Sequence, residues 1–130
     1  MANVLFVCVQ NAGRSQLAEA LFVHAAGDRH PARSAGSAPA AEVHPNVVEV
    51  MPELAGRVPR KLEQADAEWA DVVVTMGCGD ACPWLPARQR ADWELPDPKN
   101  LPIEQFRDVR DDIESRVLEL IKQLGSRPVI

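Results

Sequence analysis

The chain of 130 residues has no long hydrophobic run, because no stretch approaches the roughly 18 apolar residues that a membrane-spanning helix needs. Its apolar segment at residues 4–9 is short and has no basic flank, so it lacks the features of a secretory signal peptide. From these absences we expect neither a membrane span nor a signal peptide. We expect a cytoplasmic protein in which residues 4–9 belong to a first strand.

Cysteine and net positive charge are also scarce. The chain has 3 cysteines, which in a reducing compartment are not expected to form structural crosslinks. The net charge of −5 disfavours a nucleic-acid partner, and it requires that any anionic ligand be attracted by local groups. His24, His30 and His44 are scattered and do not have the spacing of metal ligands. We therefore predict neither a metal nor a cofactor.

Short apolar runs alternate with amphipathic segments along the whole chain. Strands are predicted at residues 3–8, 32–35, 71–76 and 91–95, and helices at 15–26, from Pro45 to a break or kink at Pro52, 63–69 and 103–124. No repeat, linker or low-complexity tract interrupts them, so residues 1–130 are expected to form a single domain. The alternation predicts an α/β fold with a parallel sheet covered by helices on both faces, and a ligand site at the carboxyl ends of the strands.

The segment between the first strand and the first helix carries most of the predicted chemistry. Cys8 ends the strand, and Arg14 and Ser15 follow at the start of the helix. A helix N-terminus, an arginine and a hydroxyl donor all favour a thiolate, and the guanidinium fork matches two oxygens of a tetrahedral anion. The residues expected to surround such an oxyanion are Val9, Gln10, Asn11, Ala12, Gly13 and Ser15. The alternative, a buried strand-end cysteine beside a surface arginine, is disfavoured by the flanking strand and helix.

Several segments together resemble the low-molecular-weight tyrosine phosphatase superfamily. They are Val7 to Gln16, Ser34-Ala35-Gly36, Ala70 to Met76, Asp97-Pro98 and Val109 to Ile113. Within that superfamily the chain is similar to the arsenate reductases over nearly its whole length. The resemblance implies a three-layer sandwich with a four-stranded parallel sheet, and Cys8 and Arg14 as catalytic residues.

Other positions separate reductases from phosphatases within this resemblance. Phosphatases usually carry a second cysteine where this chain has Gly13, and a tyrosine where it has Lys99; the chain has 0 tyrosines. Cys78 and Cys82 match the two cysteines of reductases that couple to thioredoxin. The resemblance therefore implies arsenate as substrate and thioredoxin as partner. A tyrosine phosphatase, a reductase regenerated by a small thiol such as mycothiol or glutathione, and an oxyanion sensor without turnover remain alternatives.

Arsenate reduction needs two electrons, so a second thiol must attack Cys8 after it has bound arsenic. Cys78 is the candidate, and Cys82 would then resolve the Cys8–Cys78 disulfide. One helical turn separates Cys78 from Cys82, which places Cα atoms about 6 Å apart, within disulfide range. The alternatives for this pair are zinc binding and simple burial. Asp97 resembles the general acid of the family, although a turn aspartate between prolines is the other interpretation. Trp84 is a candidate contact for the reducing partner or a packing residue.

Some reductases of this family bind potassium beneath the oxyanion loop. The corresponding residues here are Asn11, Glu19 and Ser34, with Asp66 as a possible further acid. Arg60 and Lys61 fall near the same stretch, and the ammonium group of Lys61 could occupy the position of the cation. For this reason the resemblance does not lead us to predict a metal.

Overall fold

The computed structural model of the protein describes residues 2–77, 87–95 and 101–125. In these residues all strands are parallel and form one sheet of 4 strands in the order β2-β1-β3-β4. The strands are β1 (Val4–Cys8), β2 (Ala32–Gly36), β3 (Val72–Thr75) and β4 (Gln89–Asp92). Because β1 and β3 are the inner strands and carry continuous apolar runs, the most hydrophobic part of the sequence lies at the centre of the sheet.

In the part of the chain that the structure describes, four α-helices connect and cover the strands. They are α1 (Arg14–Ala26), α2 (Pro45–Val50), α3 (Gln64–Trp69) and α4 (Ile103–Gly125). Pro45 begins α2, and the helix ends before Pro52, which starts a 3-10 turn as the missing N–H of proline requires. The predicted short helix and its break are therefore confirmed.

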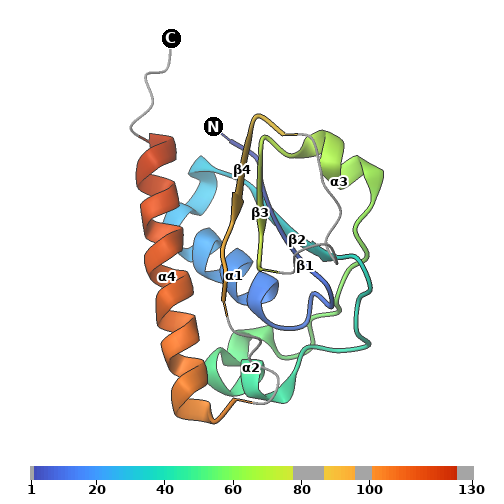
Figure 1. The fold of residues 1–130 in the computed structure, drawn as a ribbon, viewed down its shortest axis with the longest axis vertical. Coiled ribbons are helices and arrows are strands. Elements are labelled where there is room, and N and C mark those ends of the chain that lie inside the picture. Colours follow the sequence, from blue (N-terminus) through green and yellow to red (C-terminus); the bar gives the residue numbers. More distant parts are fainter. Residues whose placement is uncertain (1, 78–86, 96–100, 126–130) are drawn as a thin grey trace.

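The helices lie on both faces of the sheet, so the predicted three-layer arrangement is confirmed. Figure 1 shows α1, α2 and α4 on one side and α3 on the other. The alternation along β1 explains this division: Val4, Phe6 and Cys8 belong to the larger core cluster with α1 and α4. Leu5 and Val7 belong to a smaller cluster, against which Trp69 of α3 packs. Because both faces of β1 are buried, a shift of its register by one residue would move every side chain to the opposite core cluster.

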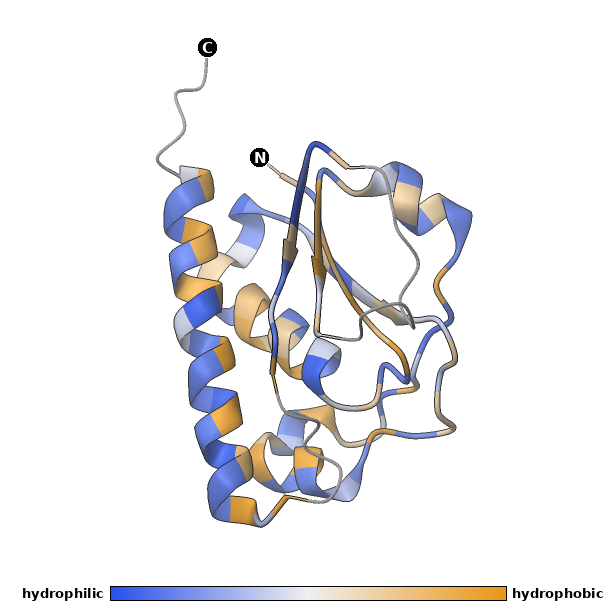
Figure 2. Ribbon diagram, in the orientation of Figure 1, coloured by the Kyte–Doolittle hydropathy of each residue, from blue (hydrophilic) through white to orange (hydrophobic). Residues whose placement is uncertain are grey.

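The helix α4 has the clearest amphipathic pattern. Phe106, Ile113 and Val117 have no exposed surface and pack into the larger cluster. In Figure 2 the apolar residues of α4 alternate with polar ones along the helix. The predicted helix at residues 103–124 is confirmed with one additional residue at its C-terminal end.

The prediction for the fourth strand was wrong in its limits. Residues 91–95 were expected, but β4 pairs with β3 from Gln89 to Asp92. Two apolar residues of the expected range, Trp93 and Leu95, lie beyond the paired segment and are buried in the larger cluster. Because β4 is a polar edge strand, hydrophobicity did not mark its beginning.

Parallel pairing brings the carboxyl ends of all strands to one edge of the sheet. Cys8 pairs with Gly36 of β2, and Val7 pairs with Thr75 of β3. Thr75 in turn pairs with Asp92 at the end of β4. Cys8 therefore lies at the carboxyl edge, where ligands of such sheets bind.

Candidate active site

The loop from Cys8 to Arg14 joins the central strand β1 to the N-terminus of α1. The first helical hydrogen bond runs from the Leu17 N–H to the carbonyl of Gly13. The N–H groups of Gly13, Arg14 and Ser15 precede this bond, so they are available to a ligand at the helix N-terminus. The partial positive charge of the helix N-terminus acts in the same direction.

The carbonyl groups of the loop accept hydrogen bonds from donors that lie around the outside of the loop. Those of Cys8, Val9, Gln10 and Ala12 accept from the N–H groups of Ser37, Ala38, Ala40 and His44, at 2.8 to 3.2 Å. The Asn11 carbonyl accepts from the Gln16 side chain at 3.1 Å. Since the carbonyls are turned away, the peptide N–H groups face the concave side. The loop expected to bind an oxyanion thus has the backbone orientation that binding requires.

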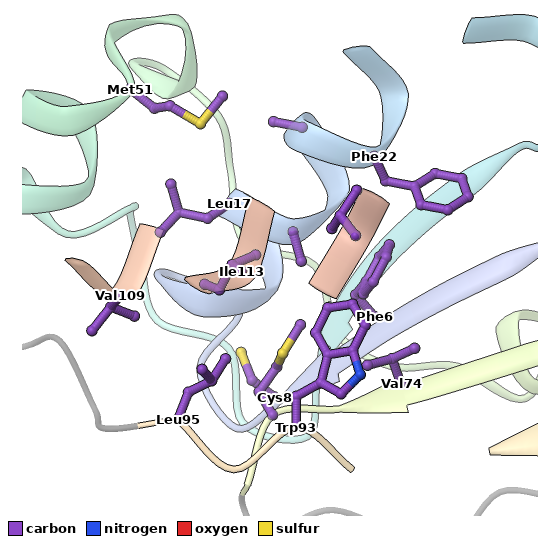
Figure 3. Close-up of a cluster of buried hydrophobic side chains, with 14 of the residues drawn as sticks. Phe6, Cys8, Leu17, Phe22, Met51, Val74, Trp93, Leu95, Val109 and Ile113 are labelled. Atoms are coloured by element: carbon purple, nitrogen blue, oxygen red, sulfur yellow. The ribbon is translucent and has the colours of Figure 1, made fainter. Parts of the chain in front are cut away.

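The Cys8 sulfur lies at the base of this loop and accepts hydrogen bonds. Cys8 has an exposed fraction of 4%, and its sulfur accepts from the Asn11 N–H at 3.1 Å. The Ser15 hydroxyl lies 2.8 Å from the sulfur. Figure 3 shows Cys8 in the core cluster that also contains Leu95 and Trp93. The sulfur therefore sits between the apolar core and the amide-lined loop.

Asn11 gives the loop its sharp turn. It is the one non-glycine residue with a positive φ among those described, at 51°, and asparagine tolerates this region better than most residues. Its side chain is fully buried, and its Nδ2 donates to the Ser15 hydroxyl at 2.8 Å. Gly36 of β2 allows the turn to come close, because a Cβ there would lie 2.5 Å from the Val9 carbonyl oxygen.

Arg14 is anchored to the edge of the sheet. Its Nη1 donates to the carbonyls of Met76 at 2.6 Å and Leu95 at 2.9 Å. These bonds tie the start of α1 to the segments that follow β3 and β4, and among the described residues they involve only Nη1. Within that part of the chain, Nε and Nη2 have no partner and can donate to a ligand in the loop, in the two-pronged geometry that suits an oxyanion.

A cluster of charged groups lies beneath the loop. Arg60 donates from Nη1 to the Ser34 carbonyl at 2.8 Å and from Nη2 to Asp66 at 2.9 Å. Its backbone N–H donates to the Asn11 side-chain oxygen at 2.8 Å. The side chain expected near the potassium position was that of Lys61. Instead the structure places the guanidinium of Arg60 against Ser34 and Asp66, and Lys61 is exposed.

The other acid of that expected ligand set is also paired. Glu19 accepts a hydrogen bond from Arg57 Nη1 at 2.6 Å. Among the described residues, no group of three or more His, Cys, Asp or Glu side chains is arranged to hold a metal ion. The sequence pointed to the stretch around Arg60, but it did not identify the Arg57–Glu19 or Arg33–Asp66 contacts, because each joins segments more than 30 residues apart in the chain.

Asp66 is the most buried ionisable group of the cluster, with an exposed fraction of 1%. Burial raises its pKa, but hydrogen bonds from Arg60, from the Glu63 N–H and from Arg33 outweigh that effect. The net result is a pKa below the ordinary carboxyl value. The ionised form is therefore favoured by the folded state.

An Asp66→Asn variant should be less stable at pH 7 by about 1–3 kcal/mol, because the charge-assisted bonds are lost. A carboxyl whose folded pKa is lowered stabilises the protein above its unfolded pKa of about 3.9, and this contribution disappears as the pH falls below that value. The variant should consequently lose less stability than the natural chain between pH 5 and 3. Urea unfolding at each pH measures this difference. If the free energy of unfolding changed with pH by the same amount in both proteins, Asp66 would not be the ionised, stabilising group.

The predicted residues Cys78, Cys82, Trp84, Asp97 and Lys99 lie outside the described residues. The segment leading to Cys78 is described as far as Gly77, whose φ is 72°. The Asp92 carboxylate accepts bonds from the Gly77 N–H at 3.0 Å and from the Thr75 hydroxyl. This aspartate was not singled out from the sequence, because its partners are set by strand pairing.

No helix in the described part of the chain has the length and apolar character needed to cross a bilayer.

The sequence of this chain is similar to those of proteins named as arsenate reductases. A Halobacterium salinarum protein assigned as an arsenate reductase is 41% identical over 130 residues, which cover 92% of this chain and 91% of that protein. The glutaredoxin arsenate reductase of a Synechocystis species is 34% identical over 132 residues, covering 96% of this chain and 100% of that protein.

A solved structure shares the same fold. The thioredoxin-dependent arsenate reductase of Corynebacterium glutamicum superposes with a TM-score of 0.78 and 40% sequence identity, over 96% of this chain. This chain spans 62% of the length of that protein. The sequence model of the low molecular weight phosphotyrosine protein phosphatases matches residues 3–128. The chain therefore belongs to the low molecular weight phosphotyrosine protein phosphatase family, as the Cys8 loop had indicated.

Proposed function

We propose that the chain is an arsenate reductase in which Cys8 is the nucleophile. The observation that carries the proposal is the position of the Cys8 sulfur, which accepts hydrogen bonds at the base of an amide-lined loop flanked by Arg14. Such a loop suits a tetrahedral oxyanion and a thiolate at once. Similarity over most of the chain to proteins named as arsenate reductases supports arsenate, and not a phosphate ester, as the substrate.

The first step joins Cys8 to arsenic. The Cys8 thiolate attacks arsenate, an S–As bond forms, and one arsenate oxygen leaves as water after protonation. Asp97 is proposed as the acid that supplies this proton. Arg14 and the loop N–H groups balance the charge of the remaining oxygens, which is the main contribution the protein makes to this step.

The second step transfers two electrons to arsenic. The Cys78 thiolate attacks the Cys8 sulfur, so that an S–S bond forms and the S–As bonding pair passes to arsenic, which leaves as arsenite. Cys82 then attacks Cys78, which releases the Cys8 thiolate and leaves a Cys78–Cys82 disulfide. A dithiol reductant restores these two thiols and completes the cycle.

Thioredoxin is the reductant that we propose, and the cytoplasm is the compartment. The name of the Corynebacterium protein supports thioredoxin, and the paired Cys78 and Cys82 would produce a disulfide that a dithiol protein can reduce. The Synechocystis relative, named for glutaredoxin, favours a second candidate in which glutaredoxin and glutathione supply the electrons.

A Cys82→Ser variant should separate the chemical step from regeneration. Without the resolving thiol, NADPH oxidation coupled through thioredoxin and its reductase should fall by about 100-fold or more, because the Cys8–Cys78 disulfide is not passed on. One equivalent of arsenite per chain should still form in a single turnover. The measurement combines steady-state NADPH absorbance with arsenite quantified after mixing with excess arsenate.

Cys78→Ser is the matched control, since it removes the thiol that releases arsenite and should abolish the single turnover as well. Full steady-state turnover by Cys82→Ser would rule out the relay. Replacing thioredoxin by glutaredoxin and glutathione in the same assay then tests the second candidate. Steady hydrolysis of an aryl phosphate without arsenate-dependent NADPH oxidation would instead identify a phosphatase, and arsenate binding without arsenite formation would identify a sensor.

A further inference from the structure

The side-chain amide of Asn11 joins the charged cluster to the nucleophile. Its Nδ2 donates to the Ser15 hydroxyl at 2.8 Å. Its Oδ1 accepts from the backbone N–H of Arg60 at 2.8 Å and from Gln16 Nε2 at 3.0 Å. Asn11, Ser15 and Gln16 are all buried, with exposed fractions of 2% or less, so each bond is shielded from water.

The direction of these bonds follows from groups that can only donate. The Arg60 backbone N–H is such a group, so the oxygen of the Asn11 amide must face it and the NH2 must face Ser15. The Ser15 oxygen then accepts from Asn11, and its single proton is left for the Cys8 sulfur, 2.8 Å away. The Cys8 sulfur therefore accepts from both the Ser15 hydroxyl and the Asn11 N–H. A hydrogen bond to an ionised acceptor is stronger than one to a neutral acceptor.

Gln16 holds both the backbone and the side chain of Asn11. Its Nε2 donates to the Asn11 carbonyl at 3.1 Å as well as to the Asn11 Oδ1. Asn11 has a positive φ, so these bonds act on the most constrained turn of the loop. The Gln16 oxygen accepts from Arg57 Nη1 at 3.3 Å, and a guanidinium can only donate. Arg57 is itself held by Glu19 at 2.6 Å.

We propose that Gln16, oriented by Arg57, is a positioning residue that makes Ser15 a hydrogen-bond donor to Cys8. A directed series of donors runs from Arg57 through Gln16 and Asn11 to Ser15, and it ends on the sulfur. Gln16 acts through other residues and does not contact the oxyanion. The inference rests on the proposed function only in taking Cys8 as the nucleophile.

The test measures how fast iodoacetamide alkylates Cys8 between pH 5 and 10, with the Cys8 peptide quantified by mass spectrometry in the complete chain. In Gln16→Met the midpoint of this profile should rise by about one pH unit, which is the size expected for a weakened bond to a thiolate. Below the midpoint alkylation should be about tenfold slower. Gln16→Glu should shift the profile further, because a carboxylate oxygen facing the Asn11 Oδ1 turns the amide around.

A double-mutant cycle separates positioning from direct electrostatics. In a Ser15→Ala background, replacing Gln16 by Met or Glu should produce a much smaller shift, because only the Asn11 N–H then connects Gln16 to the sulfur. Gln64→Met changes an exposed glutamine that bonds Glu68, and it should keep the natural midpoint. Thermal melting checks that each variant is folded.

Two outcomes would overturn the proposal: an unchanged midpoint in folded Gln16→Met, or a shift of equal size in the Ser15→Ala background. If Gln16→Met does not fold, Arg57→Met tests the same series from a half-exposed position. The Arg57→Met variant should show a smaller shift of the midpoint, which Ser15→Ala should reduce further, and no shift in Arg57→Met would overturn the proposal. No arsenate is used, so the outcome is independent of whether arsenate is the substrate.

Discussion

A Cys8→Ser variant is expected to bind arsenate and to release no arsenite. The serine oxygen is a far weaker nucleophile than a thiolate, and it forms neither a reducible S–As bond nor a disulfide. Loss of a nucleophile removes several orders of magnitude of rate, so arsenite formation should fall by about 10⁴-fold or more, to background. Binding should remain within about tenfold, because the loop N–H groups and Arg14 are unchanged.

Arsenite released over hours measures the loss of turnover, and calorimetric titration with arsenate measures the binding that is retained. Cys8→Ala is the comparison variant, since it also removes the acceptor for the Asn11 N–H and the partner of Ser15. Because a buried donor without an acceptor costs about 1–3 kcal/mol, the alanine variant should be less stable than the serine variant. Arsenite production by either variant would remove Cys8 from the mechanism.

A Gly36→Ala variant should lose most of its activity although Gly36 is not expected to contact the substrate. A Cβ at this position would lie 2.5 Å from the Val9 carbonyl oxygen and 2.9 Å from the Asn11 nitrogen. Both neighbours are backbone atoms, so the loop itself must move. Displacing a binding loop by about 1 Å can lower a rate by about 100-fold, and we expect kcat/KM for arsenate to fall by about that factor.

The strand and loop cannot separate easily, because Gly36 also donates to the Arg60 carbonyl at 2.8 Å and accepts from Leu62 at 2.9 Å. The strain should lower the free energy of unfolding by about 1–3 kcal/mol. Gly125→Ala is the matched control, since an added Cβ there meets no atom within 4 Å. Its activity and stability should be close to those of the natural chain. A fully active Gly36→Ala would show that the loop tolerates displacement.

Hydrophobic patterns predicted the central elements of this fold well. The run at residues 3–8 became β1, and the periodic stretch at 103–124 became α4. Both are buried on the faces that their patterns indicate, so local periodicity and tertiary packing agree. The edge strand β4 was misplaced because its pairing with β3, and not its hydrophobicity, sets its limits.

The site was predicted in part. The spacing of Cys8, Arg14 and Ser15 between a strand and a helix was sufficient to predict an oxyanion loop, because these residues are neighbours in sequence. The role of Arg60 could not be predicted in the same way. Its contacts with Asn11, Ser34 and Asp66 depend on how the stretch after α2 returns beneath the loop.

By itself, the sequence determined the central elements and predicted the oxyanion loop at Cys8, since these depend on residues that are close together in the chain. Only the tertiary structure decided which cation lies beneath that loop and in which direction its hydrogen bonds run. The physical reason is that a buried polar group takes its orientation from its partners. Here the partners of Asn11 include a backbone N–H that is 49 residues away in sequence.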